Sequence, residues 1–194
     1  MKQIKKLLKE IFIEGLSGMA TGLFATLIIG TIIQQIGGLI SGTIGDMLFV
    51  IGKVVASVTG VGIGCGVAVR FKESPLVIMS AATCGMMGAF ASKILVGSVL
   101  VDGNIVYAGP GEPLGAFIAA LTGIYMGRLV SGKTKVDIII TPLLSILTGS
   151  AVGLLFGPPI SKAMTFIGEI INISTQQQPF LMGILVSVLM GITL

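Results

Sequence analysis

Long apolar runs separated by short polar segments dominate the pattern along this chain. Because about 20 residues at a helical rise of 1.5 Å cross the hydrocarbon core of a bilayer, each run is a candidate membrane span. The runs cover residues 15–39, 46–69, 75–97, 113–130, 136–157 and 179–194. We therefore predict an all-α fold, a polytopic transmembrane helical bundle of about six spans.

The last apolar run is shorter than the others and reaches the end of the sequence at Leu194. With about 16 residues it falls short of the length that a span needs. We therefore expect residues 1–194 to form a single membrane domain that is a fragment or half of a longer protein.

Two further segments have a mixed pattern that is typical of amphipathic surface helices. Residues 2–13 place lysines opposite apolar side chains, and residues 159–172 do the same with Lys162 and Glu169 opposite an isoleucine-rich face. Pro158 and Pro159 are expected to end the fifth span and turn the chain into the second of these helices. Pro142 is expected to kink the first turns of that span.

Small residues recur at every fourth position in most of the runs. Such a spacing places them on one helix face, where they let neighbouring helices approach closely within a membrane. The members are Ser145, Gly149, Gly153 and Gly157 in one run, Gly115, Ala119, Gly123 and Gly127 in another, and Gly52, Ala56, Gly60, Gly64 and Ala68 in a third. These lines predict helix packing, and a smooth face on which one helix layer slides over another is the alternative.

Lysine and arginine gather in alternate loops, which predicts the orientation of the chain. They lie near the N-terminus, after the second run (Arg70 and Lys72) and after the fourth run (Arg128, Lys133 and Lys135). The intervening segments 41–46 and 96–113 hold acidic but no basic residues. By the positive-inside rule the N-terminus lies in the cytoplasm, and we expect a multi-pass protein of the bacterial inner (plasma) membrane.

Composition supports a lipid environment and excludes several kinds of function. About 54% of the residues are hydrophobic and only 10% are charged, whereas soluble domains carry about a quarter. Histidine is absent, and Cys65 and Cys84 lie inside apolar runs without metal-binding spacing. We therefore predict no catalytic residues, no metal or other cofactor and no nucleic-acid binding.

Three charged residues in or beside the apolar runs are candidates for a substrate pathway. Lys53 and Lys93 either reach the membrane interface by snorkelling or take part in a pathway, because a buried charge is costly there. Glu112 lies in the segment AGPGEPLG (108–115), which forms either a tight turn before a helix starting at Pro113 or a loop that dips toward a substrate path. Glu14 is expected to pair with the N-terminal lysines.

Two stretches of the sequence resemble a known family. The segments PLGAFIAALTGIYMGRLV (113–130) and DIIITPLLSILTGSAVGLLFGPPISKAMTFIGEII (137–171) are similar to the membrane subunit, enzyme IIC, of phosphotransferase-system sugar transporters. The likeness is nearest to fructose-type and related uncharacterised members. It rests on an ordered series of short motifs, namely Leu114-Gly115-Ala116, Gly123-Ile124-Tyr125, Pro142-Leu143-Leu144-Ser145 and Gly157-Pro158-Pro159.

The resemblance implies a sugar-translocating subunit of a phosphoenolpyruvate-dependent system. Phosphoryl transfer is then carried out by soluble IIA and IIB phosphocarrier partners. The resemblance also implies that this chain is the N-terminal half of a longer permease, chiefly a scaffold and homodimerisation half. Arg128, Lys133 and Lys135 become candidates for docking a partner, although ordinary positive-inside charge also explains them. The alternatives are another secondary transporter or channel that works through Lys53, Lys93 or Glu112, or a structural membrane module.

Overall fold

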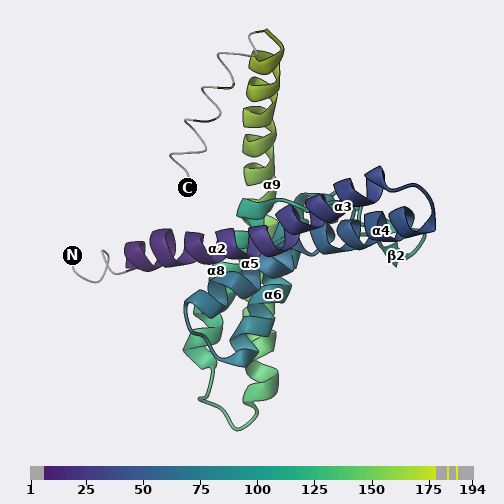
Figure 1. Ribbon diagram of the computed structural model, residues 1–194. Coiled ribbons are helices and arrows are strands. Elements are labelled where there is room, and N and C mark those ends of the chain that lie inside the picture. Colours follow the sequence, from purple (N-terminus) through teal and green to yellow (C-terminus); the bar gives the residue numbers. More distant parts are fainter. Residues whose placement is uncertain (1–6, 178–182, 184–186, 188–194) are drawn as a thin grey trace. The chain divides into compact units, whose positions relative to one another are not determined.

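The computed structural model describes residues 7–177 together with Gly183 and Ser187 (Figure 1). Almost every ordered element among them is helical, which confirms the predicted all-α class. The elements in chain order are η1 (Glu10–Gly15), α2 (Leu16–Leu23), η2 (Phe24–Ile28), α3 (Ile29–Leu39), α4 (Thr43–Ser57), α5 (Thr59–Arg70), α6 (Pro75–Ala89), α7 (Ala91–Leu95), β1 (Leu100–Val101), β2 (Asn104–Ile105), α8 (Pro113–Val130) and α9 (Asp137–Gln177).

Fewer helices than predicted are long and apolar enough to cross a membrane. In the described part of the chain there are three, Leu7–Leu39, Pro113–Val130 and Asp137–Glu169, or four if the bent pair α4 and α5 counts as one span. The predicted number of about six spans is therefore not confirmed. The run 179–194 lies outside the described residues, apart from Gly183 and Ser187.

The predicted third span, 75–97, is broken. Helix α6 ends at Ala89, Phe90 leaves the helical conformation with φ −109° and ψ 12°, and the short helix α7 follows. Phe90 is buried and packs against the ring of Tyr107 at 4.8 Å between centroids. This tertiary contact ends the helix after 15 residues, about 22 Å, which is too short to cross the bilayer alone.

The second predicted span contains a bend of 51° between α4 and α5. The hydroxyl of Ser57 donates to the carbonyl of Val54, and the hydroxyl of Thr59 donates to the carbonyl of Ala56. These bonds compete with the helical ladder around Val58, whose ψ is 20°. The line of small residues from Gly52 to Ala68 is therefore divided between two helices.

Residues 159–172 do not form a separate surface helix, contrary to the prediction, because α9 continues through Pro158 and Pro159 to Gln177. Proline has a backbone angle close to the helical value, and the carbonyl groups that lose partners can be satisfied locally within an apolar environment. The two prolines nevertheless mark a boundary between compact units, Met1–Pro158 and Pro159–Leu194.

The N-terminal amphipathic segment is likewise not a separate element where the structure describes it. Residues 7–13 belong to the continuous helix Leu7–Leu39, and residues 2–6 lie outside the described part. This long helix contains two stretches of π-helix, η1 and η2, on either side of α2. Stretches of π-helix are rare and occur often at functional sites.

The helix Leu7–Leu39 packs antiparallel along α5 and α4 through glycine (Figure 1). A Cβ atom on Gly18 would lie 2.6 Å from the carbonyl oxygen of Gly66, and one on Gly22 would lie 2.7 Å from the amide nitrogen of Ile63. Farther along, Gly30 meets Ala56 in the same way. We call this series of backbone contacts the glycine ladder.

The opposite face of α5 packs on α6, and α6 packs on α8. Gly60 and Gly64 of α5 approach the backbone of α6 so closely that a Cβ on Gly64 would fall on the carbonyl oxygen of Ala81. Buried side chains of these three helices form the hydrophobic core, which includes Ile63, Val67, Val77, Ala81, Phe117 and Ile124. Helix α5 is therefore held on two sides through small residues.

We expect one substitution to have opposite effects at two glycines. Gly64→Ala places a methyl group against the α6 backbone and lowers the free energy of unfolding by about 1–3 kcal/mol. Gly38→Ala, on the exposed side of α3 with no atom near its Cβ position, raises it by up to about 1 kcal/mol because alanine favours helix. Unfolding in detergent micelles measures both, and equal effects would contradict the packing described.

Candidate functional site

The end of α5 carries the residues that form the charged part of the candidate site. Helix α5 closes with a Schellman arrangement, in which the amide of Glu73 bonds to the carbonyl of Ala68 and that of Lys72 to the carbonyl of Val69. This cap requires a left-handed residue, which is usually glycine. Here it is Lys72, with φ of 58°.

Three ion pairs connect this end of α5 with the N-terminal helix and α8. Arg70 Nε donates to Glu14 Oε2 at 2.7 Å. Arg128 donates through Nε to Glu73 Oε1 and through Nη2 to Glu10 Oε1, both at 2.7 Å. Three segments that the sequence predicted to lie on one side of the membrane therefore meet here.

The two arginines have different surroundings. The guanidinium of Arg128 binds two carboxylates and stacks near the rings of Phe71 and Tyr125, 5.6 and 5.1 Å from their centroids. The side chain of Glu73 is only 9% exposed. Arg70 has one acidic partner, and the side chains of this pair are 54% and 39% exposed. Arg128 is therefore held in place, whereas Arg70 is accessible.

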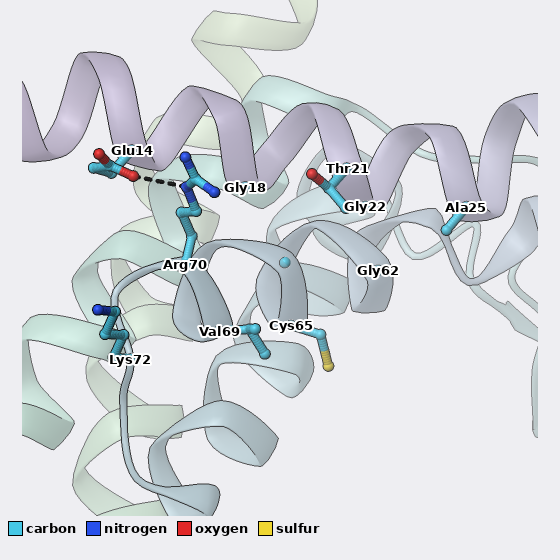
Figure 2. Close-up of a pocket in the computed structure, with 11 residues that line it drawn as sticks. Glu14, Gly18, Thr21, Gly22, Ala25, Gly62, Cys65, Val69, Arg70 and Lys72 are labelled. Atoms are coloured by element: carbon cyan, nitrogen blue, oxygen red, sulfur yellow. Dashed lines mark hydrogen bonds and ion pairs between the residues drawn. The ribbon is translucent and has the colours of Figure 1, made fainter.

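A groove of about 860 Å³ runs between the N-terminal helix and α5 along the glycine ladder, and the Arg70–Glu14 pair lies at one end (Figure 2). Figure 2 shows Arg70 reaching from the end of α5 toward Glu14, with Thr21 and Cys65 farther along the groove. Its lining is Glu14, Gly18, Thr21, Gly22, Ala25, Gly62, Cys65, Gly66, Val69, Arg70 and Lys72. Its volume lies within the usual range of small-ligand pockets.

A second hollow lies beside the groove and shares its charged end. It has a volume of about 540 Å³, and its lining is Lys9, Glu10, Glu14, Phe71, Lys72, Glu73 and Arg128. Glu14 and Lys72 line both hollows. The charged end therefore connects the two, and the groove is the larger and less polar of them.

Two of the predicted pathway residues, Lys93 and Glu112, lie at one corner beside the break at Phe90. Lys93 Nζ donates to the carbonyl of Ala108 at 2.7 Å and lies 5.4 Å from the centroid of the Phe90 ring. The amide of Glu112 donates to the carbonyl of Ala89 at 2.7 Å. Each residue thus fastens the loop before α8 to the end of α6.

Glu112 is also the N-cap of α8, where its carboxylate accepts from the amide of Leu114 at 3.5 Å and Pro113 opens the helix. Partial burial raises the pKa of Glu112, and this hydrogen bond opposes the rise. The third pathway candidate, Lys53, is exposed on α4 with its ammonium 4.9 Å from the centroid of the Phe49 ring. It is not brought to the corner that holds Lys93 and Glu112.

The three residues predicted to dock a partner lie in two different environments. Arg128 is engaged by Glu10 and Glu73, whereas Lys133 and Lys135 are exposed in the loop between α8 and α9.

The glycines predicted to pack helices lie where α6, α8 and the first part of α9 meet. Cβ atoms on Gly123 and Gly149 would both meet the sulfur of Cys84, at 2.5 Å. The Cys84 thiol donates to the carbonyl of Ser145 at 3.3 Å, and both residues are fully buried. The other predicted members also have close neighbours: Gly115 meets Gly88, Gly127 meets Ser145 and Val77, Gly153 meets Ala119 and Gly88, and Gly157 meets Ala91.

Comparison with known families identifies the chain. The family model described as Phosphotransferase system, EIIC matches residues 13–194. The chain belongs to this enzyme IIC family. No curated protein and no solved structure matches it.

As an enzyme IIC chain, it is a membrane subunit of a sugar transporter of the phosphotransferase system, with a sugar as substrate and IIA and IIB proteins as partners. The family resemblance given by the sequence motifs is thereby confirmed. The narrower likeness to fructose-type members stays a prediction.

Sequence reasoning missed most of the groove. It expected Glu14 to pair with nearby lysines, whereas the described partner is Arg70, 56 residues away. Thr21 and Cys65 carry no distinctive motif, and only the antiparallel pairing of their helices brings them to one groove. Glycines at four-residue intervals in both helices (Gly18 with Gly22, Gly62 with Gly66) were the signal that could have revealed that pairing.

The raised pKa of Glu112 predicts a pH-dependent effect of Glu112→Gln. An acid whose pKa is higher in the folded state contributes stability that is present below its ordinary pKa and is lost as pH rises through the raised value. We expect Glu112→Gln to unfold at a higher temperature than the unchanged protein near pH 7, and the difference to vanish near about pH 4. Thermal unfolding in detergent across this range measures it, and a difference that grows toward low pH would contradict the cause given.

The two arginines should differ in their importance for folding. Arg128→Gln leaves the little-exposed carboxylate of Glu73 without its partner, which lowers the free energy of unfolding by about 1–3 kcal/mol. Arg70→Gln breaks an exposed pair and costs less than about 1 kcal/mol. Chemical unfolding of both variants in micelles checks this, and equal losses would show that Arg70 is also structural.

Proposed function

We propose that this enzyme IIC chain translocates sugar in a phosphoenolpyruvate-dependent system of the bacterial plasma membrane, with its N-terminus in the cytoplasm. The meeting of three basic segments at the charged end of the bundle supports one shared side for them, and basic residues favour the cytoplasmic side. Phosphoryl transfer belongs to the IIA and IIB partners.

The groove between the N-terminal helix and α5 is our candidate for part of the sugar path. A sugar is a neutral molecule rich in hydroxyl groups, so it needs hydrogen-bonding groups and space near the backbone. The groove offers the hydroxyl of Thr21, the charged pair Glu14 and Arg70, and four glycines without side chains. The groove is the single observation that carries this placement.

Two assembly features complete the proposal. Lys133 and Lys135, which are exposed between α8 and α9, are the docking residues for a IIB partner, with Arg128 holding the neighbouring charged end together. Homodimerisation rests on the family resemblance, and the exposed apolar side chains on α3 and α4, among them Ile32, Ile36, Met47 and Val54, suit contact with lipid as well as with a second copy.

Uptake into membrane vesicles tests the function. Vesicles that contain the complete transporter, its IIA and IIB partners and the soluble enzymes that pass the phosphoryl group of phosphoenolpyruvate to IIA should accumulate a sugar from a hexose panel only when phosphoenolpyruvate is supplied inside. We expect Thr21→Trp, which fills the groove, to lower uptake about tenfold, equivalent to about 1.4 kcal/mol. Thr83→Trp, at an exposed position of α6 outside the groove, is the matched control and should leave uptake nearly unchanged.

The result has two separable parts. Uptake that is independent of phosphoenolpyruvate would refute the coupling, whatever the variants do. Equal uptake by Thr21→Trp and the unchanged protein would remove the groove from the sugar path.

A further inference from the structure

The lining of the groove is unevenly charged. Most of it is glycine, alanine, threonine, cysteine and valine, and its three charged residues lie at one end. Glu14 is negative there, while Arg70 and Lys72 are positive, so the end carries one excess positive charge. A neutral sugar does not require this excess, whereas an anionic ligand does.

Arg70 retains binding capacity after it has paired with Glu14. Its bond to Glu14 uses Nε, and no other acceptor for this guanidinium is present among the described residues. The terminal nitrogens can therefore donate to a ligand in the groove. A planar guanidinium binds two phosphate oxygens at once, which makes arginine the preferred residue for recognising phosphate.

Lys72 adds a second positive charge at the same end. It occupies the left-handed cap position of α5, where glycine would avoid the strain, and it lines both the groove and the adjoining hollow. No ion pair involves Lys72 within the described part of the chain. Its ammonium group is thus available to a ligand.

We infer that Arg70 and Lys72 form a subsite for the phosphate group of a sugar phosphomonoester, with the sugar portion extending along the groove toward Cys65. The inference rests on the proposed function, in which the phosphoryl group leaves the IIB partner and forms an ester with a sugar hydroxyl, whose proton is released. A neutral sugar in the groove thereby becomes an anion. Glu14 competes with the phosphate for Arg70. Before phosphorylation Arg70 pairs with Glu14. Afterwards the phosphate group replaces the Glu14 carboxylate, because an ion pair as exposed as Arg70–Glu14 is weak.

Arg128 does not bind the phosphate group, although it is also positively charged and lines the adjoining hollow. Two carboxylates and two aromatic rings already surround its guanidinium. The structure thus assigns one arginine to holding the helices together and the other to the ligand.

The two cysteines supply a readout that the chain already contains. Cys65 lines the groove and is partly exposed, whereas Cys84 is fully buried between α8 and α9. The rate at which N-ethylmaleimide alkylates Cys65 therefore reports occupancy of the groove. Cys84 remains unreactive as long as the protein is folded, which shows that each variant retains its structure.

The experiment uses the full chain in uncharged detergent without phospholipid, and in a parallel sample adds vesicles that contain anionic phospholipid. Alkylation of Cys65 is timed with increasing inorganic phosphate, with a panel of hexoses and with the 1- and 6-phosphates of these hexoses. We expect at least one hexose phosphate to slow alkylation at lower concentration than its parent hexose. Arg70→Gln and Lys72→Gln should each raise the half-protecting concentration of that hexose phosphate about tenfold, a difference of about 1.4 kcal/mol.

Two further variants sharpen the test. Glu14→Gln removes the competitor, so the half-protecting concentration of the hexose phosphate should fall. Lys162→Gln removes an exposed lysine that does not line the groove and should leave the half-protecting concentration unchanged. Protection that is unaffected by Arg70→Gln, or weakened by Glu14→Gln, would overturn the subsite.

The remaining outcomes also decide the matter. If no phosphate compound protects Cys65, or if only vesicles with anionic phospholipid do so, the sugar-phosphate subsite is wrong and the charges serve at most a lipid headgroup. Protection by hexoses alone would overturn the subsite while leaving the sugar path intact. Protection by hexose phosphates together with uptake that ignores phosphoenolpyruvate would support the subsite and refute the proposed coupling.

Discussion

Direct contact between helix backbones at glycine is the interaction on which the described bundle depends. Lipid gives helices no hydrophobic reason to associate, so close packing and the van der Waals contact that comes with it must hold them. Helix α5 shows this most clearly, since Gly18 meets Gly66 on one of its faces and Gly64 meets Ala81 on the other. A side chain at these positions would separate the backbones, and this explains the chain's high glycine content better than flexibility does.

The charged end of the bundle follows from the same packing. The Glu14–Arg70 pair continues the register of the glycine ladder. Four residues before Gly18 comes Glu14, and four residues after Gly66 comes Arg70, so the antiparallel pairing of the two helices brings these side chains together. The ladder also leaves a groove beside it, since glycines bring the helices together without filling the space next to them. Packing, charge and the hollow are thus consequences of one arrangement of small residues.

The sequence predicted the elements that depend on local signals. Apolar runs indicated helices, and Pro113 with Glu112 indicated the start of α8. Predictions failed where a tertiary contact or a local competition decided the outcome. Phe90 ends α6 because it packs on Tyr107, and hydroxyl bonds around Val58 bend a run that looks continuous.

Two other differences have simpler causes. Pro158 and Pro159 do not end the helix, because the backbone angle that proline fixes is close to the helical value. The hairpin of β1 and β2, which was not predicted, turns at Asp102 and Gly103, a pair typical of two-residue hairpin loops. The groove needed the pairing of two helices far apart in sequence, which no single segment reveals.

The π-helical segment η2 lies opposite the bend between α4 and α5, since Thr26 within η2 is the neighbour that a Cβ on Gly62 would meet. The two irregularities therefore occur at the same level of the helix pair. Within η2 the amide of Ile29 bonds to the carbonyl of Phe24, one residue farther back than in an α-helix, so this turn holds one surplus residue. Deleting one residue from η2 would let the turn close as ordinary α-helix, and Gly30 would still face Ala56 while Gly18 faced Gly66. A one-residue deletion within α2 removes no surplus and would rotate the two parts of the helix by about 100° relative to each other, so the ladder tolerates the loss of a residue in η2 but not in α2.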